Sequence, residues 1–169
     1  MITFKFNENK AIELVLYLAN KKSKIDKLTL LKFIFFADIY HLNKYDRPIL
    51  GGKYVAMPNG PVASELFDII KKGNSAFALN KNTILPNREG CEDYFSKSDL
   101  EALDYAFNQY SQYSGPELSD LSHEHKAWIN AREREPFSNN PIIHYKDFFD
   151  DEFSSQIEFL EENAHLMVI

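Results

Sequence analysis

Apolar positions are densest between Lys27 and Tyr45, in the stretch KLTLLKFIFFADIYHLNKY. Drawn as a helix, this stretch is apolar on nearly every side rather than along one stripe, and such a helix belongs in the interior of a domain. Asp26 can cap its first turn, because the carboxylate accepts a hydrogen bond from an unpaired backbone amide there. At 1.5 Å per residue the helix is roughly 27 Å long. The pattern therefore predicts a central buried helix over residues 27–45.

Asp38 is the exception inside this apolar stretch. A carboxylate in a buried helix has to be paired, hydrogen-bonded or partly solvated, since an isolated charge in an apolar interior is costly. We expect Asp38 to fasten the helix to nearby backbone or polar side chains, either through amides of the turn at residues 58–61 or through a basic side chain. Buried acids also occur at functional sites, but the structural role is the preferred interpretation.

Two further helices are predicted beside the central one. Apolar residues at a 3.6-residue period indicate a helix over residues 8–21, with Asn7 as its cap. The short polar connection to the central helix favours packing of the two side by side. A second pattern runs from Pro61 to Lys72; proline suits the first position of a helix, and Gly73 suits its end.

The later part of the chain is also mainly helical in pattern. Ser98 and Glu101 have the spacing of a capping box, in which a serine and an acidic residue three positions later exchange hydrogen bonds with the backbone. Pro136 and Pro141 bracket a loop. The remaining helical segments are a short helix over residues 117–125, a helical turn at Trp128 and Ile129, and a final helix at about 151–166, whose acidic start at Asp150, Asp151 and Glu152 suits the helix dipole.

Strand signals are few and short. Residues 53–57 suit a strand, and residues 83–85 and 93–95 are predicted to pair as a small hairpin. Residues 74–82 are polar, with three asparagines, and are predicted to form an exposed loop. The fold class is therefore mainly α (α+β with minor β), a compact bundle of about six helices around the central helix at 27–45.

Length and charge narrow the class of protein. The 169 residues suit a single domain, 1–169, and the one cysteine excludes an intramolecular disulfide. The net charge of −6 argues against a nucleic-acid surface, although four lysines cluster at positions 21, 22, 24 and 27. No signal-like segment and no uncharged apolar run of membrane-spanning length occurs. We expect a cytoplasmic protein without membrane association.

Candidate chemistry is concentrated in SDLSHEH, Ser119 to His125. This cluster of serines, histidines and acids can form an active site, or it can be a capped, solvent-facing short helix with local hydrogen bonds. The second interpretation is favoured, since no GxSxG elbow is present. His123 and His125 are two positions apart and point to different faces of a helix, and neither HExxH nor paired CxxC occurs. We expect no catalytic residue, no cofactor and no metal.

Two blocks of sequence together resemble a known family. FADIYHLNKYDRPILGGKYVAMPNGPVASELFDIIKKG, Phe36 to Gly73, looks like the signature block of the Panacea (SocA-like) antitoxin domain, whose members include phage-associated proteins. LSDLSHEHKAWINAR, Leu118 to Arg132, resembles a later segment of the same family. Phe67 departs from the pattern, in which tyrosine is common. The resemblance covers about residues 10–135 and leaves 136–169 as a C-terminal helical extension. The motif residues that become possible partner contacts are Asp38, His41, Asn59, Gly60, Pro61, Ser64, Glu65, His123 and Trp128.

The resemblance implies a non-enzymatic role as the antitoxin of a toxin–antitoxin system. The expected partner is a cognate protein toxin, encoded by an adjacent gene and neutralised by direct binding. An acidic surface suits a basic toxin, and exposed aromatic side chains are natural anchors. The candidate anchors are Tyr110, Tyr113, Trp128 and Phe137.

Three alternatives remain open. The protein can be an adaptor that delivers the toxin to a Clp-type protease. It can be an enzyme that uses the Ser/His/Asp cluster at 119–125. It can also be a transcriptional regulator that reads DNA, which the acidic charge disfavours.

Overall fold

The computed structural model describes residues 1–150 and 154–169 of the chain. Asp151, Glu152 and Phe153, where the last predicted helix begins, lie outside the described residues. The α-helices are α1 (Glu8–Lys21), α2 (Lys27–Tyr45), α3 (Ser64–Lys72), α4 (Lys97–Tyr110), α5 (Gly115–His123), α6 (Lys126–Arg134) and α7 (Ser154–Asn163). The strands are β1 (Tyr54–Met57), β2 (Gly60–Ala63), β3 (Phe77–Asn80), β4 (Thr83–Pro86) and β5 (Ile142–Ile143). Short 3-10 helices span Glu92–Tyr94, Tyr145–Phe148 and Ala164–Leu166. The predicted fold class, mainly α with minor β, is confirmed.

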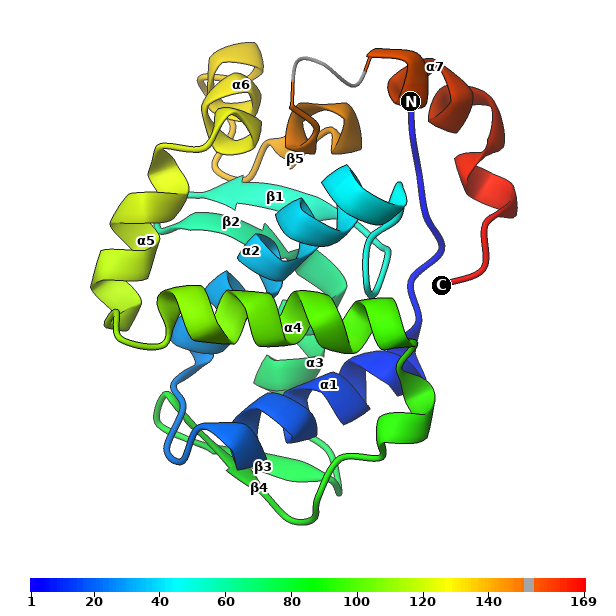
Figure 1. Ribbon diagram of the computed structural model, residues 1–169. Helices are drawn as coiled ribbons and strands as arrows, with labels where there is room; N and C mark the ends of the chain where they lie inside the picture. Colours follow the sequence, from blue (N-terminus) through cyan, green and yellow to red (C-terminus); the bar gives the residue numbers. More distant parts are fainter. Residues whose placement is uncertain (151–153) are drawn as a thin grey trace.

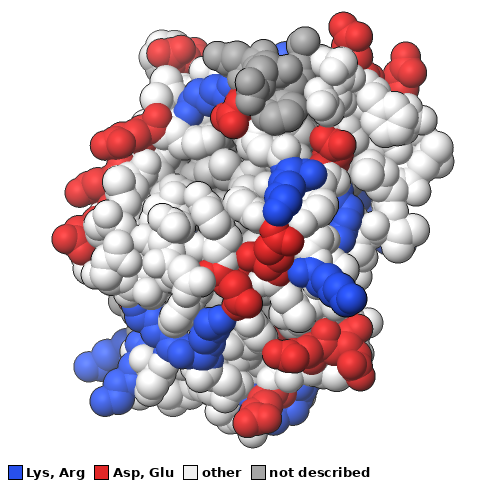
Figure 2. Space-filling model, viewed as in Figure 1, with Lys and Arg blue, Asp and Glu red and all other residues white. Residues whose placement is uncertain are grey.

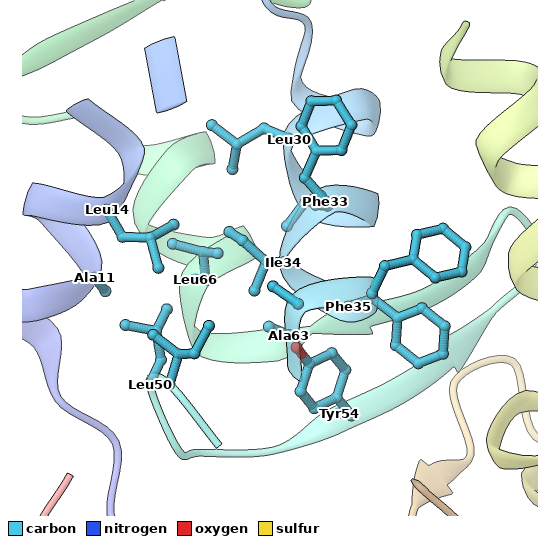
Figure 3. Packing of buried hydrophobic residues seen from close by; sticks show 14 of the residues in the cluster. Ala11, Leu14, Leu30, Phe33, Ile34, Phe35, Leu50, Tyr54, Ala63 and Leu66 are labelled. Atoms are coloured by element: carbon cyan, nitrogen blue, oxygen red, sulfur yellow. The ribbon is translucent and has the colours of Figure 1, made fainter. Parts of the chain in front are cut away.

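Helix α2 is the centre of the molecule, as its sequence predicted (Figure 1). Its bounds and its cap are both confirmed, since Asp26 accepts a hydrogen bond from the Thr29 amide at 2.9 Å. Leu30 and Ile34 point toward side chains of α1 and α3, while Phe35 points the other way, toward the strands (Figure 3). The helix is therefore buried on opposite sides at once, which explains why its apolar residues do not form a single stripe.

Helix α4 lies across α2, and its start differs from the prediction. The cap is Ser96, and the capping box is completed by Asp99 rather than by Glu101 three residues after Ser98. Ser96-x-x-Asp99 has the same spacing two residues earlier, and it places the buried Asp99 rather than the half-exposed Glu101 at the third helical position. Helix α1 begins after its Asn7 cap, as predicted.

The strands β2, β1 and β5 form one antiparallel sheet in that order. Met57 pairs with Gly60, so Pro58 and Asn59 make a two-residue turn. The prediction that Pro61 starts a helix is wrong, because Pro61 lies in β2 and α3 begins at Ser64. Proline is compatible with this position because β2 is an edge strand that needs no donor on its open side.

A second hairpin, β3–β4, corrects two predictions. Residues 74–82 are not a loop throughout, since Phe77 is buried and β3 pairs with β4. Residues 93–95 are not the partner of 83–85, because most of that segment belongs to a 3-10 helix. The asparagines around this segment made it read as polar. Phe77 and Leu79, two positions apart as on one face of a strand, direct their side chains to the core.

The C-terminal third also differs in detail from the prediction. Ser114 caps α5 with Glu117 as its capping-box partner, so this helix starts at Gly115 and ends at His123. The predicted turn at Trp128 is the full helix α6, and the last α-helix ends at Asn163 rather than at Leu166. Within residues 136–169, β5 pairs with β1. Phe148 and Phe149 are buried in the common core, so this segment completes the fold.

Candidate functional site

Side chains of α5 and α6 line up along backbone carbonyls of the β1–β2 hairpin. Ser119 Oγ donates to the Asn59 carbonyl at 2.7 Å. His123 Nε2 bonds the Pro58 carbonyl at 2.9 Å, and Trp128 Nε1 donates to the Met57 carbonyl at 2.9 Å. An arginine of α6 completes the row at 3.2 Å from the Ala56 carbonyl. We call these four side chains the hairpin clamp: Ser119, His123, Trp128 and Arg132.

The clamp depends on how α5 meets α6. His125 lies between the two helices, and its Nδ1 accepts from the Ala127 amide, which caps the start of α6. The ring centroids of His123 and Trp128 then lie 4.3 Å apart, so the two rings reach neighbouring carbonyls from adjacent helices. A carbonyl oxygen can only accept, and the imidazole of His123 must therefore carry its proton on Nε2.

Lys32 holds the hairpin from the inside. Its Nζ donates to the Pro61 carbonyl at 2.8 Å, and the residue is 0% exposed. Burial without a neighbouring carboxylate lowers the pKa of Lys32 to about 7. The hairpin is thus bonded through donors on both its outer and its inner side.

Gly60 is required where these groups meet. Its φ is +101°, and a Cβ there would stand 2.3 Å from Ser122 Oγ and 2.7 Å from Lys32 Nζ. Ser122 is itself buried and donates to the Ser119 carbonyl at 2.7 Å. Only glycine satisfies both the backbone conformation and the space.

A pocket of about 480 Å³ lies beside the turn of this hairpin. We call it the hairpin pocket. Its lining comes from α2, the hairpin, α3 and the β3–β4 turn, and it includes Leu28, Leu31, Met57, Val62 and Phe67. Pro58 and Asn59 form part of its edge. Motif residues that the sequence singled out therefore border a surface able to receive an apolar group.

Asp38 is fully engaged by the neighbouring chain. Its two oxygens accept from the Ile49 amide at 2.7 Å and from the Tyr54 hydroxyl at 2.6 Å, and the residue is 1% exposed. The prediction that it fastens α2 to backbone and polar groups is confirmed. The predicted contact between Asp38 and the turn at residues 58–61 is not formed. Lys32, nearly two helical turns earlier in α2, donates to the Pro61 carbonyl of that turn instead. Burial raises the pKa of Asp38 to about 6 despite these donors.

His41 belongs to a separate buried polar cluster around Asp99. Lys10 Nζ lies 2.7 Å from Asp99 Oδ2, and Arg47 lies 3.3 Å from Oδ1. Burial opposes the charge of Asp99, but Lys10 and Arg47 hold its pKa below the usual value. His41 Nδ1 donates to the Arg47 carbonyl at 2.5 Å, and burial lowers the pKa of His41. This cluster joins α1, α2 and α4.

The sequence did not predict the Asp99 cluster as a unit. Lys10 and Asp99 come from different helices, and each has a local explanation as a surface lysine or a capping acid. Only for Lys10 does the sequence indicate burial, because Lys10 stands four residues before Leu14 and so lies on the buried face of α1.

Ser64 and Glu65 fix the start of α3 against the chain before β1. Glu65 Oε2 accepts from the Lys53 amide at 2.8 Å. The Ser64 amide donates to the Lys53 carbonyl at the same distance. These two motif residues lie apart from the clamp.

The Ser119–His125 cluster does not assemble a nucleophile and base among the described contacts. Ser119, Ser122 and His123 each bond a backbone carbonyl, and His125 caps α6. In residues 1–150 and 154–169 no group of three or more His, Cys, Asp or Glu side chains converges as metal ligands. No helix in that part of the chain has both the length and the apolar content to span a membrane.

The candidate aromatic anchors differ widely in exposure. Tyr110 stacks on Phe36 with ring centroids 4.1 Å apart, in a second pocket of about 410 Å³. The ring centroids of Tyr113 and Tyr110 lie 6.4 Å apart. Trp128 is part of the hairpin clamp, in which it donates to the Met57 carbonyl. Phe137 is 100% exposed in the loop after α6. Of the four, Phe137 is the one that contributes nothing visible to the core.

Comparison with known proteins gives one match. Residues 30–129 match the family model described as "Antitoxin SocA-like, Panacea domain". This range contains most of α2, the hairpin, α3, α4, α5 and the start of α6, including three of the four clamp residues. A search of curated proteins and a search of solved structures each found no match. The family model covers more than half of the chain, and the chain therefore belongs to the SocA-like antitoxin family defined by the Panacea domain.

Proposed function

We propose that this protein is the antitoxin of a toxin–antitoxin system and neutralises a cognate protein toxin by direct binding. The observation that carries the proposal is the match of residues 30–129 to the antitoxin-like Panacea domain. The matched segment contains a hairpin held on both sides by donors, and it supplies most of the lining of the pocket at the hairpin turn. A rigid, partly apolar surface of this kind suits protein recognition, because little ordering is needed on binding.

The same site supports a binding role over a catalytic one. The serines and the histidine of the 119–125 cluster are used as donors to the hairpin backbone. Lys32 and Ser122 are near each other but 0% exposed, so a substrate cannot reach them without opening the fold. We propose further that residues 1–169 act as one domain, because β5 and Phe148 join the common sheet and core. A cytoplasmic location of this domain is part of the proposal.

Co-expression with the product of the adjacent gene tests the proposal. Expression of that product alone should arrest growth, and this protein should restore growth and purify with it as a stable complex. The DNA-binding alternative is tested in parallel by salt-dependent binding to the operon's own promoter. An adjacent product that is harmless, or whose toxicity is unchanged by this protein, would contradict the proposed function.

The strain used for co-expression separates direct neutralisation from delivery to a protease. In cells that lack Clp proteases, direct binding predicts full protection and an unchanged half-life of the toxin. Protection that disappears in those cells, together with faster toxin degradation in the parent strain, would assign the adaptor mechanism instead.

A further inference from the structure

The hairpin pocket combines an apolar floor with one lysine in its lining, Lys27, and a second, Lys71, beside the Phe67 ring. Its floor is formed by Leu28, Leu31, Met57, Val62 and Phe67. Its volume lies within the range of roughly 300–1,000 Å³ that is usual for ligand pockets. A large aliphatic or aromatic side chain fits the apolar character of this floor.

Two lysines stand over the aromatic part of the floor. Lys27 Nζ lies 5.0 Å from the centroid of the Phe67 ring, and Lys71 Nζ lies 5.3 Å from it. Lys27 lines the pocket itself, and Lys71, one helical turn after Phe67 in α3, holds a cation–π contact with the same ring. The carboxylate in the lining, Asp26, is turned into its helix cap, where it accepts from the Thr29 amide at 2.9 Å and the Thr29 hydroxyl at 2.6 Å.

Basic side chains are frequent on the surface near the pocket (Figure 2). Lys and Arg side chains gather where the α1–α2 connection meets the β3–β4 hairpin, whereas acidic side chains mark the exposed edge of α5 (Figure 2). Lys81 stands in the β3–β4 turn next to Asn82, which lines the pocket. The pocket therefore lies by a positive region of a protein whose net charge is −6.

The walls of the pocket are fixed before any partner arrives. The Met57 and Pro58 carbonyls are held by Trp128 and His123, and the Asn59 carbonyl is held by Ser119. On the opposite wall, the Lys27 amide donates to the Asn82 carbonyl at 2.7 Å. Such preorganisation reduces the entropy lost on binding.

We propose that the hairpin pocket binds a protein segment in which one large apolar side chain is flanked by carboxylates. The apolar side chain enters between the hairpin and Phe67, and the flanking carboxylates pair with Lys27 and Lys71. The inference rests on the proposed function only in taking this segment to be part of the toxin. It replaces the simple expectation that the acidic net charge selects a basic surface on the partner.

Selection of random peptides displayed on phage, with the full-length chain as bait, tests the chemistry without the toxin. The enriched peptides should carry Leu, Ile or Phe next to Asp or Glu. The variant carrying Lys27→Glu and Lys71→Glu should bind them at least about tenfold more weakly. The matched control, Lys97→Glu with Lys146→Glu, makes the same change of net charge on exposed lysines outside this pocket and should weaken binding less than about twofold. Peptides without acids, equal binding to both variants, or no enrichment would each overturn the inference.

A second arm uses the growth assay with the adjacent gene product. If the wild-type chain and the control protect cells while the Lys27/Lys71 variant does not, both the inference and the proposed function are supported. If all three protect equally, the inference fails and the proposed function stands. If none protects, the proposed function fails, and the peptide selection still decides the pocket. Thermal unfolding checks each variant, and Lys27→Gln with Lys71→Gln replaces any charge reversal that does not fold.

Discussion

Lys32 donates to the carbonyl of Pro61 at 2.8 Å from a position with no exposure to solvent. The contact ties the first half of α2 to β2, the strand that follows the hairpin turn. It also places an ionisable amine where no carboxylate balances it, since burial alone accounts for its lowered pKa. The centre of the fold is thus held by a group that is costly to charge.

The variant Lys32→Met should remove a pH dependence of stability on the alkaline side of neutrality. The pKa of Lys32 is about 7 in the folded chain and about 10.5 when unfolded. Between these values the unfolded chain holds more protons, so the free energy of unfolding of the wild type rises with pH. Relative to Lys32→Met, the gain should reach up to about 1.4 kcal/mol per pH unit. Urea unfolding of both proteins from pH 7 to 10 measures it, and parallel curves would contradict the lowered pKa.

Gly60→Ala should destabilise the protein by about 3 kcal/mol. The substitution imposes a side chain at φ +101° and drives its Cβ to within 2.3 Å of Ser122 Oγ. Gly73→Ala is the matched control, because Gly73 also has a positive φ, +69°, but open space around its Cβ position. It should cost about 1–2 kcal/mol, because its φ of 69° and ψ of 171° lie in a region that residues with a side chain rarely adopt. Equal losses for the two variants in urea unfolding would mean that backbone strain at positive φ, rather than close packing at the hairpin, explains why position 60 requires glycine.

Asp38→Asn should remove a pH dependence of stability on the acidic side of neutrality, with the opposite sign to that of Lys32. The pKa of Asp38 is about 6 when folded and about 3.8 when unfolded, so between these values the folded chain holds more protons. The wild type should therefore lose stability relative to Asp38→Asn as the pH rises from about 4 to about 6, by up to about 3 kcal/mol. Thermal unfolding of both proteins across this range provides the measurement. A wild type that instead gains on the variant would show that its two donors outweigh burial.

Trp128→Phe should loosen the hairpin while preserving the helix that carries it. The substitution keeps an aromatic ring beside His123 but deletes the donor to the Met57 carbonyl. The expected loss is about 1–2 kcal/mol. Hydrogen–deuterium exchange should rise in residues 54–63 and stay unchanged in α1. Ile129→Ala, at the next and exposed position of α6, should leave both segments unaltered.

Local sequence signals predicted the elements that depend on local chemistry. The apolar run and the Asp26 cap gave α2 its bounds, and Asn7 gave the start of α1. Local signals failed where two segments compete. Pro61 suits a helix start by itself, but pairing with β1 places it in a strand. Ser98 has a capping spacing, but burial of Asp99 selects Ser96.

For the candidate site, the sequence pointed to some of the residues, and the tertiary structure decided what they do and added others, such as Lys32 and Arg132. The motif blocks identified Asn59, Gly60, His123 and Trp128, and the buried pattern of α2 required a partner for Asp38. That α5 and α6 bring donors to the carbonyls of a hairpin some 60 residues earlier depends on packing between distant segments. The same holds for the contact that the Phe67 ring makes with Lys27, a residue of a different helix. Hydrophobic period and capping are encoded within a few residues, whereas contacts between helices are fixed only when all of them close around a common core.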